Sequence, residues 1–321
     1  MDYVNLGRTG LKVSRLCFGC MTYGLKSWRP WVLTEEEGRP FLDAALDAGI
    51  NFFDTADQYS LGENEAILGR FLYDRKARNR VVVATKLYNP MSDDPNDRGL
   101  SRRHVFQAVD ASLKRLGTDW IDLYQLHRWD YHTPIEETID ALNDVVRAGK
   151  VRYLGGSSMF AWQFMKAIGL QRANGYAQFV SMQPQLNLLY REEEREMLPL
   201  CRSEGIGVIP WSPIARGRLA GATTTSRAAT DDIAKRYYPG DAQEVAIVDA
   251  VRAVAERRGV NPATLALAWV LSRPGITAPI IGASKPGHFT DAIAALSLQL
   301  DDEEKSLLEA PYRPRPVAGP L

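Results

Sequence analysis

The segment Val105–Leu126, VFQAVDASLKRLGTDWIDLYQL, joins two structural patterns around one glycine. Val105–Leu116 has apolar side chains at helical spacing, whereas Ile121–Leu126 is a short, largely apolar run typical of a buried strand. Gly117 lies between them, and glycine readily adopts the left-handed backbone conformation that often ends a helix. The segment therefore predicts a helix that ends at Gly117 and leads into a strand.

The same unit recurs along the chain. The helical patterns Leu42–Ala48, Ile135–Ala148 and Met197–Glu204 are each followed by a glycine and then by an apolar run. Counting these runs and similar ones gives eight expected strands: Leu16–Gly19, Ile50–Asp54, Val81–Lys86, Ile121–Leu126, Val151–Leu154, Phe179–Gln183, Ile206–Pro210 and Ile276–Gly282. Apolar strands without strict alternation are typical of parallel strands that are covered on both faces.

Eight alternating β and α units in 321 residues favour an α/β fold of the (β/α)8 TIM-barrel type. An open dinucleotide-binding sheet is disfavoured, because no G-x-G-x-x-G follows the first strand. Residues 4–13 read as a β-hairpin that turns at Arg8–Gly10 and caps the N-terminal end of the barrel. Residues 215–240 show little periodicity and read as a long loop, either functional or disordered. We expect one domain over residues 1–321, with extra helices at its C-terminal end.

The composition narrows the classes of function. Lys plus Arg and Asp plus Glu both number 39, so the basic excess typical of nucleic-acid binding is absent. No stretch approaches the roughly 18 apolar residues that span a bilayer, and no signal peptide is visible, so we expect a cytoplasmic protein without a membrane partner. Cys17 and Cys20 form a C-x-x-C, which we read as buried thiols rather than as a redox or metal site. No pattern defines an oligomeric state.

Polar residues follow the expected strands at the end where barrel enzymes carry their chemistry. Asp54 ends the second strand, Lys86 ends the third and His127 follows the fourth, while Tyr59 lies in the loop after Asp54. Each residue alone is more typical of a cap, a turn or a solvated loop. Together, at neighbouring strand ends, they predict one site.

These four residue types suit the reduction of a carbonyl group, which needs a hydride donor and a proton donor. A tyrosine can give the proton if its pKa is lowered, and a nearby ammonium group such as that of Lys86 lowers it. Asp54 can hold Lys86 charged and oriented. His127 can donate a hydrogen bond to the carbonyl oxygen.

Two other classes of barrel enzyme fit less well. Metal-dependent barrel hydrolases cluster histidines and carboxylates, but this chain has four histidines and no H-x-H after its first strand, so no metal site is expected. Glycosidases need two facing carboxylates, and Asp54 has no clear partner at another strand end.

At these positions the sequence resembles the aldo-keto reductase superfamily along essentially its whole length. Residues 51–59 (NFFDTADQY) resemble the signature that holds the catalytic Asp and Tyr, and residues 83–86 (VATK) resemble the catalytic-lysine strand. Residues 113–127 (LKRLGTDWIDLYQLH) are similar to the longest signature, which ends on the catalytic His. Within the superfamily, the chain looks closest to the branch of aryl-alcohol dehydrogenase-like enzymes and potassium-channel β subunits.

The resemblance implies a nicotinamide cofactor and the residues that hold it. Ser157 and Gln183 match residues that bind the carboxamide, and Ser158 stands where the family usually has Asn. Trp211 matches the aromatic residue stacked on the nicotinamide ring, and Ser212, Pro213, Ile214, Arg216 and Gly217 match the loop over the pyrophosphate. Near Gly282, Ser284 and Lys285 would hold a 2′-phosphate, which favours NADPH. His288 and Asp291 stand where Gln and Glu usually contact the adenosine, and Ala292 replaces the usual Asn.

The substrate pocket is predicted from aromatic residues in the loops after the strands: Tyr23, Trp28, Trp31, Tyr88 and Trp129. They favour aromatic or bulky aldehydes and ketones. Arg128, Arg29 or Lys26 would instead favour an anionic carbonyl compound. A channel-β-like protein that holds the cofactor as a sensor or scaffold, with slow or no turnover, is the alternative to a reductase.

Overall fold

Eight parallel strands in a computed structural model of the chain form one sheet in the order β10-β3-β4-β5-β6-β7-β8-β9. The structure describes residues 1–221 and 230–317. The strands are β3 (Cys17–Gly19), β4 (Phe52–Asp54), β5 (Val82–Leu87), β6 (Ile121–Leu126), β7 (Val151–Ser157), β8 (Phe179–Gln183), β9 (Gly207–Val208) and β10 (Ile280–Ile281). A parallel bridge between Val208 and Ile276 joins the two edges of the sheet, so the predicted TIM barrel is confirmed.

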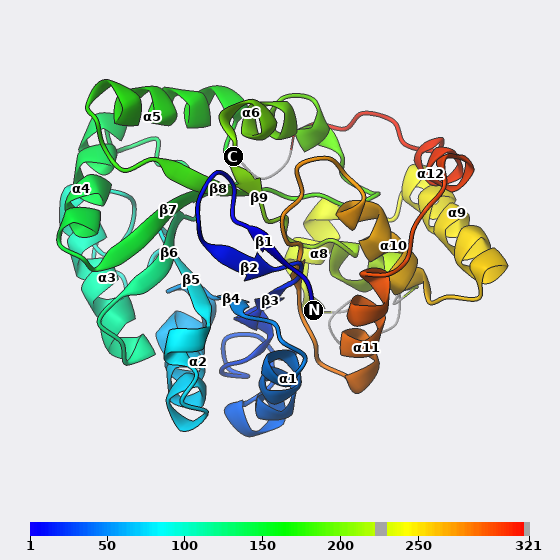
Figure 1. Cartoon of the computed structure of the whole chain (residues 1–321), viewed down its shortest axis with the longest axis horizontal. Coiled ribbons are helices and arrows are strands. Elements are labelled where there is room, and N and C mark those ends of the chain that lie inside the picture. The colour runs from blue at the N-terminus through cyan, green and yellow to red at the C-terminus, as the bar shows by residue number, and fades with distance from the viewer. Residues whose placement is uncertain (222–229, 318–321) are drawn as a thin grey trace.

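Helices surround the strands on the outside of the sheet (Figure 1). They are α1 (Glu35–Asp47), α2 (Glu63–Asp74), α3 (Arg102–Leu116), α4 (Ile135–Arg147), α5 (Ala161–Ala173), α6 (Met197–Glu204), α8 (Asp232–Tyr237), α9 (Ala242–Arg258), α10 (Pro262–Leu271), α11 (Pro286–Ala295) and α12 (Asp302–Glu309). The helix α12 follows the last barrel helix and contacts α9 through an ion pair of Arg258 with Glu304 at 2.9 Å. Extra helices were predicted at the C-terminal end of the chain, and α12 is one such helix.

The N-terminal hairpin consists of β1 (Tyr3–Asn5) and β2 (Lys12–Ser14), which pair antiparallel. Its apolar side chains Leu6 and Val13 are fully buried against the inner barrel residues Cys17, Phe52, Val82, Ala84, Leu123, Ile209 and Ala278. The amide of Arg8 also donates to the carbonyl of Gly205, directly before β9, at 2.8 Å. The hairpin therefore closes the N-terminal end of the barrel and leaves the opposite end for the site.

Some boundaries differ from the predicted ones. The first helix begins at Glu35 rather than Leu42, because Thr34 and Glu37 form a capping box. The seventh and eighth strands are shorter than predicted. The predicted loop 215–240 contains a 3₁₀ helix at Ala215–Ala220 and the helix α8, while its residues 222–229 lie outside the described part of the chain.

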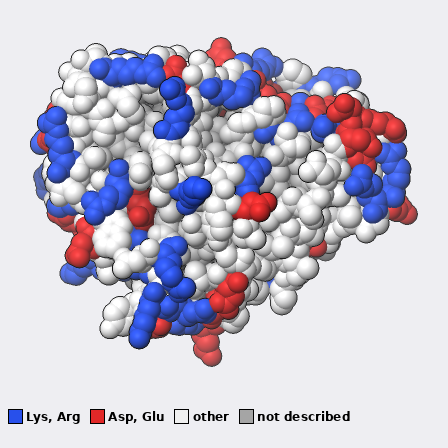
Figure 2. Space-filling view, viewed as in Figure 1, with Lys and Arg blue, Asp and Glu red and all other residues white. Residues whose placement is uncertain are grey.

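Basic and acidic side chains are interspersed on the face that carries the hairpin (Figure 2). This distribution agrees with the balanced charge of the sequence. Of the helices that the structure describes, none combines the length and apolarity needed to cross a membrane. Cys17, Cys20 and Cys201 are free and buried.

Candidate active site

A cavity of about 930 Å³ opens at the C-terminal ends of the strands. It extends from Asp54, Tyr59 and His127 at one end to Ser284 and Lys285 at the other. Its size lies within the range of small-molecule and cofactor sites. Most of the predicted cofactor residues line it: Ser157, Gln183, Trp211, Ser212, Pro213, Ile214, Arg216, Gly217, Gly282, Ser284, Lys285, His288 and Asp291.

Lys86 connects the acidic and phenolic groups at the bottom of this cavity. Its Nζ donates to Asp54 Oδ2 at 2.7 Å and to the Thr55 carbonyl at 2.8 Å, and it lies 3.5 Å from the Tyr59 hydroxyl. Lys86 is fully buried at the end of β5, and Asp54 ends the adjacent strand β4. The register of these parallel strands thus brings together residues that are far apart in the sequence.

Two glutamines orient the Asp54 carboxylate. Gln125 Nε2 and Gln183 Nε2 donate to Asp54 Oδ1 at 3.1 Å and 2.8 Å, respectively. Gln183 was predicted to bind a carboxamide, and here its amide also bonds to the carboxylate. The role of Gln125 was missed in the sequence, although it stands two residues before His127 on the same strand, β6.

His127 lies beside Tyr59, with the two rings edge-to-face and their centroids 6.0 Å apart. The side-chain nitrogen of Asn89 lies 3.3 Å from Nδ1 of His127. An amide nitrogen can only donate, so Nδ1 accepts and the hydrogen of the neutral ring is on Nε2. Nε2 is therefore the nitrogen that can donate a hydrogen bond to a substrate. Asn89 was not predicted, but it is the second residue after β5.

Burial dominates the electrostatics of the site. It raises the pKa of Tyr59, and Lys86 offsets only part of this effect. We expected Lys86 to lower the pKa of Tyr59, and its own contribution has that sign, but the net shift is upward. Burial lowers the pKa of Lys86, yet Asp54 and Tyr59 raise it more. Burial, with Arg128 and Lys86, places the pKa of His127 well below its usual value. The site thus contains a protonated phenol, an ammonium group and a neutral imidazole.

The segments predicted to hold the nicotinamide meet at the ends of β7 and β8. Ser157 Oγ donates to the Gln183 carbonyl at 2.8 Å, and Trp211 Nε1 donates to Ser158 Oγ at 3.0 Å. Ser158, Ser212 and Arg216 have φ of 46°, 53° and 55°, a region that non-glycine residues rarely occupy. Such strained positions cluster at binding sites.

The far end of the cavity is polar and basic. Arg216 forms an ion pair with the buried Asp231 at 2.5 Å. The amide of Ser284 donates to His288 Nδ1 at 3.4 Å, and burial raises the pKa of Asp291. Cationic and hydroxyl side chains such as those of Lys285 and Ser284 suit phosphate groups. The residues that line the cavity, and its volume of about 930 Å³, therefore fit a nicotinamide dinucleotide.

The predicted aromatic pocket is only partly formed. Trp28 and Trp31 line the cavity, and the Trp28 ring lies 6.2 Å from that of Tyr59. Tyr23 does not: it is fully buried in the core, where its hydroxyl donates to the Ala283 carbonyl at 2.8 Å. Trp129 is buried beside Trp162, with ring centroids 6.1 Å apart, and Tyr88 is half-buried outside the lining. Of the five predicted pocket residues, Tyr23, Tyr88 and Trp129 therefore do not line this cavity.

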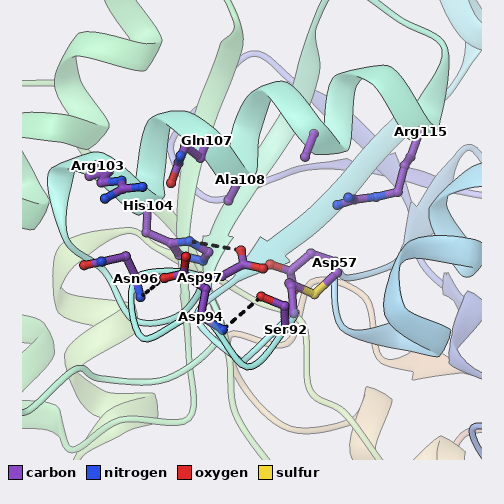
Figure 3. A pocket seen from close by; sticks show the side chains of 12 residues that line it. Asp57, Ser92, Asp94, Asn96, Asp97, Arg103, His104, Gln107, Ala108 and Arg115 are labelled. Atoms are coloured by element: carbon purple, nitrogen blue, oxygen red, sulfur yellow. Dashed lines mark hydrogen bonds and ion pairs between the residues drawn. The ribbon is translucent and has the colours of Figure 1, made fainter.

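A second cavity of about 370 Å³ lies between α3 and the loop after β5 (Figure 3). Its walls include Asp57 and His104, both buried, and the exposed Arg103. In the described structure, Asp57 Oδ2 and the ring nitrogens of His104 have no hydrogen-bond partner. Its lining contains none of the four residues Asp54, Tyr59, Lys86 and His127.

No group of three or more His, Cys, Asp or Glu side chains in residues 1–221 and 230–317 is arranged to hold a metal ion.

The chain is similar to known proteins along nearly its whole length. The profile of the aldo/keto reductase family matches residues 15–312. The chain is 44% identical to a versiconal hemiacetal acetate reductase of Aspergillus parasiticus, and the match covers 99% of this chain and 98% of the relative. It is 43% identical to the aldo-keto reductase dtxS3 of Metarhizium robertsii, over 99% and 93% of the two chains. A Schizosaccharomyces pombe protein provisionally named an aryl-alcohol dehydrogenase is 43% identical, over 99% and 98%.

Proposed function

The chain belongs to the aldo/keto reductase family, and on that premise we propose that it reduces aldehydes and ketones to alcohols with NADPH, with Tyr59 as the general acid. Family membership and the reductases among its relatives support an oxidoreductase that acts on carbonyl groups. The observation that carries the finer proposal is the hydrogen-bonded group of Asp54, Lys86 and Tyr59 beside a neutral His127.

The cofactor would lie along the cavity from Trp211 to Lys285. Ser157, Ser158 and Trp211 would hold the nicotinamide, Arg216 and Gly217 the pyrophosphate, and Ser284 with Lys285 the 2′-phosphate. His288 and Asp291 would lie against the adenosine. When bound, the reduced dinucleotide supplies the hydride. The preference for NADPH rests on the charge of Lys285 and on the hydroxyl of Ser284.

The residues of the chain then provide the proton and the orientation. The substrate oxygen is placed between the Tyr59 hydroxyl and the Nε2–H of His127. As negative charge develops on that oxygen, His127 stabilises it by a hydrogen bond and Tyr59 transfers its proton. The raised pKa of Tyr59 keeps the phenol protonated before the reaction. The resulting phenolate is stabilised by Lys86, which Asp54 holds in place.

The substrate is expected to be an aromatic or bulky carbonyl compound. Trp28 and Trp31 line the cavity beside Tyr59 and offer flat apolar surfaces. Burial of an aromatic ring against such surfaces contributes to binding both through apolar area and through ring contacts.

Tyr59→Phe tests the mechanism, because it keeps the ring and removes the proton donor. We expect the reduction of aromatic aldehydes to slow by about 10²–10⁴-fold, with little change in NADPH affinity. Turnover like that of the wild type would exclude Tyr59 as the acid. A wild-type protein that binds NADPH tightly but reduces no aldehyde of an aromatic panel would instead indicate a cofactor-binding sensor or scaffold.

A further inference from the structure

One guanidinium group at the substrate end of the larger cavity has no part in the proposed chemistry. Arg128 follows His127 directly and lines the cavity. Its Nη1 donates to the His127 carbonyl at 2.6 Å, which fixes the side chain next to the imidazole. The guanidinium has further N–H groups that can donate to partners other than His127.

Arg128 is not neutralised by a carboxylate in the described structure. Burial lowers its pKa, and the groups that raise it are the hydroxyls of Tyr237, Tyr59 and Tyr88. Other cations of the site each lie close to a carboxylate. Lys86 lies 2.7 Å from Asp54, and Asp231 lies 2.5 Å from Arg216 and 3.9 Å from Arg29. Arg128 thus retains its charge in a partly desolvated place, which is unfavourable without a counterion.

The position of Arg128 is close to the reacting groups. Its charge contributes to the pKa of both Tyr59 and His127. Tyr237 raises the pKa of Arg128 and packs edge-to-face on Trp211, with ring centroids 5.8 Å apart. The guanidinium therefore borders the space between Tyr59, His127 and Trp211, where a carbonyl substrate would bind.

We propose that Arg128 forms an anion-binding subsite, and that the preferred substrates are carbonyl compounds that carry a carboxylate or phosphate. The proposal rests on the reductase function and adds a substrate class to it. A guanidinium matches anionic oxygens with two parallel hydrogen bonds, and a substrate anion would replace the missing counterion. The aromatic walls at Trp28 and Trp31 would hold the apolar part of the same molecule.

Matched pairs of probes test the subsite. Phenylglyoxylate is compared with its methyl ester, and 4-formylbenzoate with methyl 4-formylbenzoate, which differ in charge but little in shape. A further probe, 4-formylphenyl phosphate against 4-methoxybenzaldehyde, separates phosphate from carboxylate recognition. The measured quantity is the ratio of kcat/KM for the anion to that for its neutral partner. Comparison of this ratio between variants cancels the intrinsic reactivity of each probe.

We expect Arg128→Met to lower this ratio at least about tenfold for one or more pairs, while the neutral probe is retained. Arg128→Lys keeps the charge and is expected to restore part of the ratio. Lys26→Met is the control, because Lys26 lies outside the cavity in an exposed ion pair with Glu37 at 2.7 Å. It removes the same charge from the protein and should leave the ratio within about twofold.

Two results would overturn the subsite. One is a ratio that Arg128→Met does not change. The other is an equal loss for anionic and neutral probes with NADPH binding intact, which would assign Arg128 to the positioning of His127. If wild-type protein reduces no probe with NADPH or NADH, the proposed function fails instead.

Binding measurements on the wild-type protein test the subsite without any turnover and without a variant that must fold. Benzoate and benzamide are titrated against the protein saturated with NADP⁺, with quenching of tryptophan fluorescence as the readout. The subsite requires wild-type protein to bind benzoate more tightly than benzamide, and 4-formylbenzoate and benzoate to compete. Equal affinities for benzoate and benzamide would overturn it even if Arg128→Met does not fold.

Discussion

The side-chain nitrogen of Asn89 lies 3.3 Å from Nδ1 of His127, and this contact defines which ring nitrogen carries the hydrogen. Because burial places the pKa of His127 well below its usual value, the ring is neutral and has only one N–H. Asn89 therefore acts as a positioning residue that keeps the hydrogen on Nε2. The hydrogen bond that His127 is proposed to donate to the carbonyl oxygen of a substrate depends on the presence of this hydrogen on Nε2.

Asn89→Leu should lower kcat for carbonyl reduction about tenfold or more, because Nδ1 loses its donor and the two neutral tautomers become closer in energy. Nitrogen chemical shifts of ¹⁵N-labelled His127 provide the direct readout, and should show the Nε2–H form in wild type and a mixture in the variant. Asn174→Leu, at the surface end of α5, is the matched control. An unchanged tautomer in Asn89→Leu would contradict the assignment.

The lowered pKa of His127 also predicts how stability depends on pH. Below about pH 6.5 the unfolded chain protonates this histidine while the folded chain does not, so the unfolded state binds more protons. Stability contributed by neutral His127 is therefore lost as pH falls below the unfolded pKa. Between pH 6.5 and 5, the free energy of unfolding should fall more steeply in wild type than in His127→Asn, by up to about 1.4 kcal/mol per pH unit.

Urea unfolding at several pH values measures this difference. His104, whose pKa burial also lowers, is present in both proteins and cancels in the comparison. Parallel pH profiles for wild type and His127→Asn would show that His127 becomes protonated in the folded state without penalty.

Lys86→Met should shift the pH profile of reduction in a defined direction. Burial raises the pKa of Tyr59, whereas Lys86 lowers it, so removal of the ammonium group should raise the pKa further. The alkaline limb, which reports loss of the phenolic proton, should lie above the usual range of a tyrosine in wild type and move to still higher pH in Lys86→Met. The rate itself should fall by about 10²-fold or more, because the phenolate loses its cation. A limb that moves to lower pH would refute the role of Lys86.

The sequence predicted the centre of this site because its residues end neighbouring parallel strands. Strand register pairs Asp54 with Ala84 and Lys86 with Gln125, so chain order and spatial order agree. Glycine-punctuated helix and strand patterns were sufficient to predict the barrel. The predicted bounds of the last two strands were less accurate. The strands β9 and β10 have only two residues each, because prolines lie close to both of them in the sequence.

Loop residues were harder to predict, because tertiary contacts determine where they point. Tyr23 was predicted to line the pocket because it is an aromatic residue in a loop after a strand. It packs instead on Gly38 of α1, where the absence of a side chain leaves room for the ring. The orientation of Asn89 depends on a loop whose course follows from contacts such as the hydrogen bond from the Leu100 amide to Asp130 Oδ2, at 2.8 Å. No local pattern encodes such contacts.

Ser158→Asn should strengthen the binding of the nicotinamide part of the cofactor. Ser158 has φ of 46°, and Asn tolerates this left-handed region better than Ser. The amide oxygen of Asn can also accept the hydrogen bond from Trp211 Nε1, now 3.0 Å from Ser158 Oγ. We expect severalfold tighter NADPH binding and about 0.5 kcal/mol more stability. Ser158→Ala, which cannot accept that bond, should weaken binding; equal affinities in the three proteins would show that residue 158 does not contact the cofactor.

Lys285→Met should lower the catalytic efficiency with NADPH much more than that with NADH. Lys285 lines the far end of the cavity and is available to a 2′-phosphate, which NADH lacks. Loss of a charge-assisted contact of about 1.5–3 kcal/mol should lower kcat/KM for NADPH by at least about tenfold, and that for NADH by less than about twofold. Lys305→Met, which removes a charge from the exposed pair with Asp302 on α12, is the control. If Lys285→Met weakens both cofactors equally, this lysine acts on the shared pyrophosphate or on the fold of the loop, and the basis for an NADPH preference would then have to lie in Ser284.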